Sequence, residues 1–237
     1  MGQPNNYSTE LPLRCLDLLN SLLGVVENDR KTAERHGGAL TTTLTLALAT
    51  PMLMLPIERI QKHLNQAEGY ADDRELSPEL TKRIDVAVKG KKLADYPKFA
   101  EFDWYYLANV APFNLATGLS SNLTAQLSGD NARSAAAALD FAAFLSCLRN
   151  GLSHGGILYL DERGRSSYGQ ASMICFVSAR QEYMRPFCDQ RNGRCPPINP
   201  AIRDLRLLRI SENNFRAFLT NWVGWLQDAG LRNLTAE

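Results

Sequence analysis

The chain has 237 residues, of which 45% are hydrophobic and 22% are charged, and its formal net charge is +1. This composition excludes an intrinsically disordered protein, and no repeat or low-complexity segment indicates a solenoid or fibrous protein. The length and apolar content are sufficient for one large core, and no convincing linker divides the chain. We therefore expect a single domain over residues 1–237, with its core at about 11–229.

The sequence also predicts a cytoplasmic protein that has no contact with a membrane. The apolar run at 44–57 contains Pro51 and Pro56 and is shorter than the roughly 20 residues that a membrane span needs. The amino terminus lacks the basic region and apolar stretch of a secretion signal. The five cysteines are an odd number with uneven spacing, which favours reduced thiols.

Charge is distributed unevenly along the chain. Residues 1–148 carry 14 lysines and arginines against 17 acidic residues, a balance of −3, whereas residues 149–237 carry 12 against 8, a balance of +4. All twelve cations of the second segment are arginines. The planar guanidinium suits recognition of phosphate or carboxylate, although arginines that merely solvate a sheet and its loops would give the same composition.

Helical patterns dominate the first part of the chain. Apolar residues at helical spacing predict a helix over 11–35, which His36-Gly37-Gly38 ends. A second helix is expected over 39–66, kinked or interrupted by its two prolines. Ser77-Pro78-Glu79 predicts a further helix start, with a serine cap, proline in the first turn and an acid near the positive end, and this helix should reach about Val88.

The middle of the chain gives weaker patterns. Residues 102–107 are rich in aromatic side chains, and residues 122–127 are consistent with a short helix. Residues 131–153 then form the clearest pattern, a helix that is apolar nearly all round and so belongs at the centre of a bundle. Gly155-Gly156 should end this helix.

After residue 156 the hydrophobic period changes from helix to strand. Residues 157–160, 171–179 and 205–210 are predicted strands, and the turn-like segment 161–165 joins the first two. A loop with cysteines and prolines spans 187–200, and Ser211-Glu212 begins a final amphipathic helix. The expected fold class is therefore mainly α, a helical bundle with a small antiparallel β-sheet inserted before the C-terminal helix.

The strongest chemical signal lies where the central helix ends, in Arg149-Asn150-Gly151-Leu152-Ser153-His154. Arginine binds phosphate through a planar set of N–H donors, and histidine transfers protons near neutral pH. Arg149 and His154 are five residues apart, about 140° around a straight helix, so they need help to converge on one ligand. Asn150 and His154, by contrast, share one helix face, as do Arg149 and Ser153.

Two arrangements would bring arginine and histidine together. The helix end can fray at the glycines and free His154, or a two-fold dimer can bring a second copy of the helix to the same point. Metal-free RNA cleavage requires a base for the 2′-hydroxyl, an acid for the leaving 5′-oxygen and a cation for the phosphoryl oxygens. Gly151 permits a close approach of backbone, partner helix or phosphate. The structural alternative is that His154 interacts favourably with the negative end of the helix dipole while Arg149 extends into solvent.

Other candidate sites are weaker. Cys188 and Cys195, with Cys175 upstream, could bind zinc, but their spacing is not that of a usual zinc knuckle, so shielded thiols or an adventitious disulfide are favoured. His36 and His63 are predicted to be helix-end and surface residues rather than ligands. Neither a metal nor a cofactor is expected.

Two further groups of residues could take part in the site. The aromatic run 104–106 could stack on bases, although such runs more often belong to a core. Three acidic residues of the first helix could approach the site if that helix packs against the central one: Asp17, Glu27 and Asp29.

At Arg149-Asn150-x-x-x-His154 the sequence resembles HEPN domains (higher eukaryotes and prokaryotes nucleotide-binding), whose Arg-x4-His motif ends a central helix. Many HEPN proteins are metal-independent ribonucleases of bacterial toxin–antitoxin, abortive-infection and antiviral defence systems, and they act as dimers with both motifs in one cleft. The resemblance covers about 11–229, with the strands matching a subgroup of bacterial HEPN-family nucleases. It implies that Arg149 and His154 are catalytic, with Asn150 supporting them by orienting His154 or touching the phosphate.

One departure from the family pattern is informative. HEPN proteins regulated by nucleotidyltransferase partners carry a tyrosine two residues after the histidine, where this chain has Gly156, so that form of regulation is not expected. The sequence thus predicts a homodimeric endoribonuclease that acts on RNA, with Ser153 and Gly151 as RNA-binding or supporting residues and with a possible antitoxin or defence-system partner. The alternatives are a non-catalytic HEPN-like module that binds nucleotide, nucleic acid or a partner protein, and a purely structural dimerisation domain.

Overall fold

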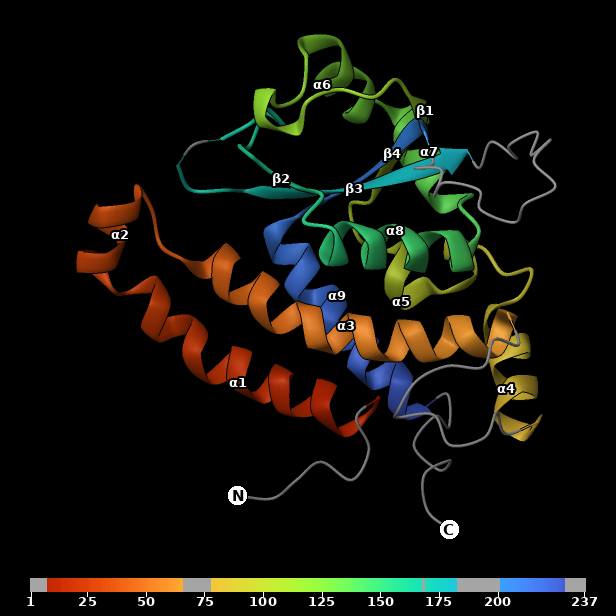
Figure 1. The fold of residues 1–237 in the computed structure, drawn as a ribbon. Coiled ribbons are helices and arrows are strands. Elements are labelled where there is room, and N and C mark those ends of the chain that lie inside the picture. The colour runs from red at the N-terminus through yellow and green to blue at the C-terminus, as the bar shows by residue number, and fades with distance from the viewer. Residues whose placement is uncertain (1–7, 66–77, 168, 183–200, 229–237) are drawn as a thin grey trace, which may run out of the picture.

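A computed structural model describes residues 8–65, 78–167, 169–182 and 201–228 (Figure 1). A bundle of helices lies on one face of a small antiparallel sheet, and a short helical segment covers the other face. The mainly α class and the small sheet ahead of the C-terminal helix are as the sequence predicted. The loop expected at 187–200, with Cys188 and Cys195, lies outside the described residues, as does Ser77.

The helices occur in three groups along the chain. In chain order they are α1 (Glu10–Glu27), α2 (Arg30–His36), α3 (Thr41–Asn65), α4 (Pro78–Val88), α5 (Pro97–Ala100), α6 (Ser121–Leu127), α7 (Asp130–Ala137), α8 (Phe141–Ser153) and α9 (Glu212–Asp228). Two 3-10 turns, η1 (Leu93–Asp95) and η2 (Leu115–Thr117), lie in the connections. The helices predicted to begin at Pro78, near 122 and after Ser211 are confirmed.

Two predicted helices are each divided into two. The helix expected over 11–35 breaks before α2, because the Asp29 side chain accepts a hydrogen bond from the backbone N–H of Thr32 and caps a new helix. The helix expected over 131–153 breaks between α7 and α8, where Asp140 caps α8 by accepting from Ala143 N–H. Hydrophobic periodicity did not predict either break, because the helical pattern of the sequence continues through the capping residue from the first helix of each pair into the second.

Helix α3 continues through both of its prolines rather than breaking at them. Pro56 has no N–H for the carbonyl of Met52, four residues earlier. That carbonyl instead accepts a hydrogen bond of 3.0 Å from the indole Nε1 of Trp222 on α9. A tertiary contact therefore satisfies the group that the proline leaves free, and this compensation cannot be seen in the local sequence.

Of the helices in the described segments, α3 is the one long and apolar enough to cross a membrane by length and composition. It packs against α1, α4, α8 and α9 (Figure 1). Its buried residues include Ala49, Met52, Leu53 and Ile57, none of which is measurably exposed. The apolar character of α3 is thus accounted for by its place at the centre of the bundle.

The sheet has four strands in the order β1-β4-β3-β2, and all neighbouring pairs are antiparallel. The strands are β1 (Tyr105–Val110), β2 (Ile157–Leu160), β3 (Met173–Glu182) and β4 (Ala201–Ser211). The last three correspond to the predicted strands. Strand β1 comes from the aromatic-rich segment, for which no strand was predicted, so the sheet is not wholly an insertion before the last helix.

Alternation along β3 separates two apolar clusters. Ile174 and Phe176 point into the main core with α8 and α9, whereas Cys175 and Val177 point into a second cluster on the opposite face. Leu127 of α6 belongs to that second cluster, and Figure 1 shows α6 on the side of the sheet opposite α8. The sheet is therefore buried on both faces and forms the middle layer.

Three sequence interpretations are resolved by burial. Trp104 and Tyr106 are core residues, as the more conservative interpretation held. His36 ends α2 and is exposed, as predicted. The interpretation of His63 as a surface residue is wrong: it is buried between α3 and α4, where its Nδ1 lies 2.8 Å from the Thr81 hydroxyl and burial lowers the pKa of the imidazole.

Candidate functional site

Helix α8 carries the candidate site at its C-terminal end. The helix ends at Ser153, and His154 follows as the capping residue with φ −103° and ψ 7°. Gly155 then adopts a left-handed conformation, with φ +65°, which is typical of a glycine after a helix. His154 still follows the helical path, because its backbone N–H donates to the Asn150 carbonyl at 3.1 Å, and the chain turns away only after it. The chain leaves the helix at Gly155, so the fraying considered from the sequence does not include His154.

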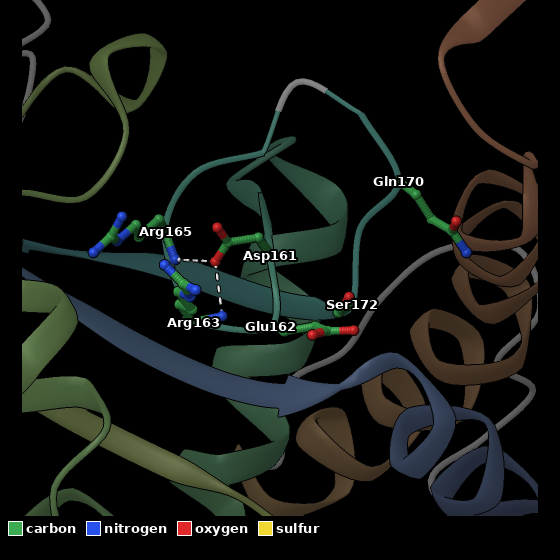
Figure 2. A pocket seen from close by; sticks show the side chains of 6 residues that line it. All are labelled: Asp161, Glu162, Arg163, Arg165, Gln170 and Ser172. Carbon is green, nitrogen blue, oxygen red and sulfur yellow. Dashed lines mark hydrogen bonds between the residues drawn. The ribbon is translucent and has the colours of Figure 1, made fainter.

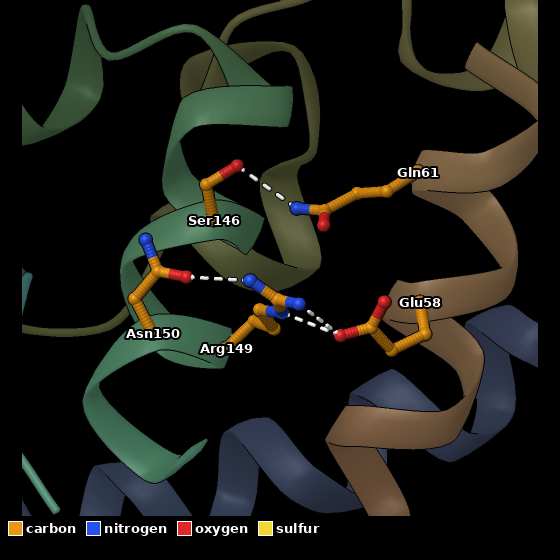
Figure 3. Close-up of polar contacts among 5 residues, drawn as sticks. All are labelled: Glu58, Gln61, Ser146, Arg149 and Asn150. Atoms are coloured by element: carbon orange, nitrogen blue, oxygen red, sulfur yellow. Dashed lines mark hydrogen bonds and ion pairs between the residues drawn. The ribbon is translucent and has the colours of Figure 1, made fainter. Parts of the chain in front are cut away.

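Arg149 is held from two sides (Figure 3). On one side its Nε and Nη2 each lie 2.5 Å from the Glu58 Oε1 of α3. On the other side its Nη1 donates a hydrogen bond of 3.0 Å to the Asn150 Oδ1. Gln61 of α3 also donates to the Ser146 hydroxyl at 2.9 Å, so the two helices share polar contacts on successive turns. These contacts place the guanidinium between α3 and the sheet.

Asn150 links Arg149 to the sheet rather than to His154. Its amide Nδ2 donates a 3.0 Å hydrogen bond to the hydroxyl of Ser178, a buried residue of β3. The side-chain oxygen is occupied by Arg149, and the backbone carbonyl accepts from His154 N–H at 3.1 Å. Asn150 thus supports the arginine, because the side-chain hydrogen bonds of its amide go to Arg149 and Ser178.

Arg149, Asn150 and His154 line one cavity of about 410 Å³. The other described lining residues come from the β1–α6 connection, from β3, from β4 and from the residue before β2. They are Pro112, Phe113, Leu115, Gly156, Val177, Ala179, Gln181, Ile202 and Leu205. The predicted catalytic pair therefore faces a common space in one protomer, with His154 exposed and 31% of the Arg149 side chain accessible.

The donor count of Arg149 shows what remains for a ligand. A guanidinium has five N–H donors. The contacts with Glu58 and Asn150 use three of them, which leaves one N–H on each Nη nitrogen. Two such donors can contact a phosphate. Arg149 lines the cavity and Glu58 is not among the described lining residues.

The two remaining predicted residues, Ser153 and Gly151, lie within the motif but differ in environment. Ser153 is exposed in the last turn of α8 and does not line the cavity. Gly151 is buried, and a Cβ there would lie 2.9 Å from the Cβ of Phe176, so β3 uses the close approach that this glycine permits. Gly156 is equally confined, since an added Cβ would lie 2.3 Å from the Val177 carbonyl oxygen. No side chain can occupy position 156 without moving β3.

The arginines of the second half have several different environments. Arg180 and Arg203 pair with Asp204, and Arg216 pairs with Glu212. Arg209 is buried with its guanidinium 4.1 Å from the Tyr105 ring centroid and 2.9 Å from the Ser128 hydroxyl, and burial lowers its pKa. These four arginines therefore have partners within the protein.

A second cavity, of about 450 Å³, lies over the β2–β3 loop (Figure 2). Its lining includes Arg163 and Arg165 beside Glu162 and Asp161. The Asp161 carboxylate accepts from the backbone N–H groups of Arg163 and Arg165 at 2.8 and 2.9 Å, which shapes the turn that the sequence predicted. The carboxylates oppose binding of an anion there, and Arg149 and His154 lie elsewhere.

The described cysteines are buried and free. Burial raises the pKa of Cys147 to about 11 and that of Cys175 to about 12. Zinc binds thiolate, so a thiol that resists ionisation in an apolar sheet is a poor ligand. Within the described segments, no group of three or more histidine, cysteine or acidic residues could hold a metal ion.

Sequence reasoning missed Glu58, Gln61 and Ser178. It considered acids of the first helix, but the carboxylate beside Arg149 comes from α3, 91 positions earlier in the chain. One signal was present: the stretch 41–57 contains no charged residue, and Glu58 is the first one after it. A carboxylate that follows so long an apolar run on a core helix is a candidate to pair with a cation of a neighbouring helix.

The fold and site together define a mostly helical protein with a four-stranded antiparallel sheet and an Arg-Asn-His group where a core helix meets that sheet. In comparisons with known proteins, no family model, no curated protein and no solved structure matches the chain.

Proposed function

We propose that this protein is a metal-independent endoribonuclease of the HEPN type, which acts as a cytoplasmic homodimer in bacterial defence or as part of a toxin–antitoxin pair. The observation that carries the proposal is that Arg149 and His154 line one open cavity although they are five residues apart. The two N–H groups left on Arg149 offer a phosphate contact, and the exposed imidazole can exchange protons with a ligand in the same space.

The reaction we propose begins with proton transfer from the ribose 2′-hydroxyl to a His154 imidazole. The 2′-oxygen attacks phosphorus, the bond to the 5′-oxygen breaks, and a second imidazole protonates that leaving oxygen. Arg149 stabilises the charge on the non-bridging oxygens, while Asn150 keeps the guanidinium in place. The products are a 2′,3′-cyclic phosphate and a 5′-hydroxyl. One chain supplies one such histidine, so a dimer provides both the base and the acid.

The test is RNA cleavage by a His154→Ala variant. Loss of a positioned acid or base should lower the cleavage rate roughly 10²–10⁴-fold. His36→Ala is the matched control, because His36 is also an exposed histidine at a helix end and should leave the rate unchanged. Circular dichroism should show that both variants remain folded. Cleavage by His154→Ala at the wild-type rate would refute the assignment.

Two further readouts belong to the same assay. Cleavage should continue in EDTA, whereas a strict requirement for magnesium would point to another mechanism. Mass spectrometry of the fragments should find cyclic phosphate termini.

A second candidate function is favoured by one specific observation. Glu58 forms an ion pair with Arg149, as expected if this arginine has a structural role and the cavity only binds a ligand. A non-catalytic HEPN-like module that binds nucleotide, nucleic acid or a partner protein would then be the better description. Such a module would bind RNA in a gel-shift experiment without cleaving single-stranded or structured RNA under any of the conditions above.

A further inference from the structure

The cavity beside Arg149 and His154 has an apolar wall that phosphate chemistry does not require. Phe113 and Leu115 contribute from the connection between β1 and α6, and Ile202 contributes from β4. These side chains come from segments of the chain far from the motif. A site for phosphate alone would be lined by donors, so the wall indicates a ligand that also has an apolar face.

The exposure of this wall supports the same conclusion. Ile202 is 51% exposed, and it lies among the first three residues of β4, which are exposed, whereas the rest of that strand is largely buried. Phe113 and Leu115 are partly buried and pack against the second apolar cluster, which holds them in position while they face the cavity. Exposed apolar side chains that gather around polar groups are typical of a ligand site.

The size and the polar groups narrow the choice of ligand. The cavity measures about 410 Å³, within the range of about 300–1,000 Å³ for small-molecule sites, and so suits one nucleotide better than a duplex. Gln181 also lines it and is exposed, so its amide can both donate to and accept from the edge of a base. The aromatic ring of Phe113 offers a face for stacking.

We infer that this cavity is a base subsite, in which an unpaired nucleobase lies against Phe113 while its phosphate meets Arg149 and His154. The inference rests on the proposed function and specifies its substrate class. A base inside a duplex is stacked and paired and cannot enter an apolar cavity, so the scissile nucleotide must be single-stranded or flipped out. Gln181 then reads the exposed edge of the base.

The first test is binding of adenosine 3′-monophosphate, which offers no bond to cleave, measured by calorimetry with inorganic phosphate as the reference. The nucleotide should bind at least about tenfold more tightly than phosphate, since stacking on an aromatic side chain adds to affinity. Phe113→Ala should remove most of that advantage, and Phe113→Trp should retain it. Phe102→Ala is the matched control, because Phe102 is another partly buried phenylalanine at the edge of a core.

The second test is cleavage of one RNA sequence as a single strand and as a perfect duplex. The single strand should be cut and the duplex spared, and Phe113→Ala should raise the KM for the single strand roughly ten- to a hundredfold. Equal binding of nucleotide and phosphate, or no effect of Phe113→Ala, would overturn the base subsite and leave the ribonuclease proposal standing. Nucleotide binding that depends on Phe113, without any RNA cleavage, would instead reject the ribonuclease and keep the subsite.

Discussion

Under the proposed function, Arg149 serves two opposing purposes. Glu58 and Asn150 fix its position, yet the Glu58 carboxylate also repels any phosphate that approaches the same guanidinium. Both partners of the ion pair are about one-third exposed, with 31% of the Arg149 side chain and 37% of the Glu58 side chain accessible. Water therefore screens the pair, and its contribution to stability is modest. The carboxylate orients the arginine at some cost in affinity for an anion.

Replacement of Glu58 by glutamine separates these two effects. The amide oxygen of Glu58→Gln can still accept from Arg149, but the negative charge is lost. We expect single-stranded RNA to bind roughly two- to fivefold more tightly, as suits an exposed pair worth about 0.5–1 kcal/mol. Fluorescence anisotropy with labelled RNA in the His154→Ala background measures binding without cleavage.

The control for this experiment is Glu27→Gln. Glu27 is an exposed carboxylate at the end of α1, and its replacement changes the net charge by the same amount. If both variants strengthen binding equally, the gain is a general charge effect and Glu58 does not oppose the phosphate at Arg149. Weaker binding by Glu58→Gln alone would mean that orientation of the arginine outweighs repulsion.

At the level of the elements, the packing of α8 against β3 determines where the candidate site lies. Two glycines allow this contact, Gly151 within the helix and Gly156 after it. At each position, atoms of β3 occupy the space that a Cβ would need. Gly156 also accepts a 2.7 Å hydrogen bond from Val177 N–H, which joins the end of the motif to the sheet. His154 lies between these two glycines, so its position relative to the cavity depends on both contacts.

Gly156→Ala should therefore destabilise the fold. Its Cβ would lie 2.3 Å from the Val177 carbonyl oxygen, so the backbone must shift, at a cost of about 1–3 kcal/mol in the free energy of unfolding. Gly224→Ala is the matched control, because Gly224 lies within α9 with nothing within 4 Å of an added Cβ. That change should stabilise the protein by about 0.5–1 kcal/mol. Urea unfolding of both variants measures the difference, and an unchanged midpoint for Gly156→Ala would contradict this account of the α8–β3 contact.

At the level of the whole molecule, the proposed reaction predicts that two chains complete one catalytic centre. A single chain brings one Arg149 and one His154 to the cavity, whereas the proposed reaction uses two imidazoles. Wild-type protein mixed with excess His154→Ala, under conditions that allow subunit exchange, distinguishes the two cases. If both histidines of a dimer are required, activity should fall with the square of the wild-type fraction.

A fourfold excess of His154→Ala makes the two cases easy to separate. Total activity should drop to about one twenty-fifth of an all-wild-type sample of the same concentration if the dimer is required, and to about one fifth if one chain is sufficient. The same excess of His36→Ala should leave total activity unchanged, which controls for mixing. Light scattering establishes the mass of the species, and a linear fall in activity would show that one protomer cleaves alone.

The amino-acid sequence by itself determined the mainly α class, the three strands before the last helix, and Arg149, Asn150 and His154 as candidates. These features follow from local periodicity, capping and motif spacing, all of which act over a few residues. The tertiary structure alone decided the addition of β1 to the sheet, the burial of His63 and the pairing of Arg149 with Glu58. Each of these joins segments distant in the chain, and such contacts are selected by packing, which local propensity does not encode.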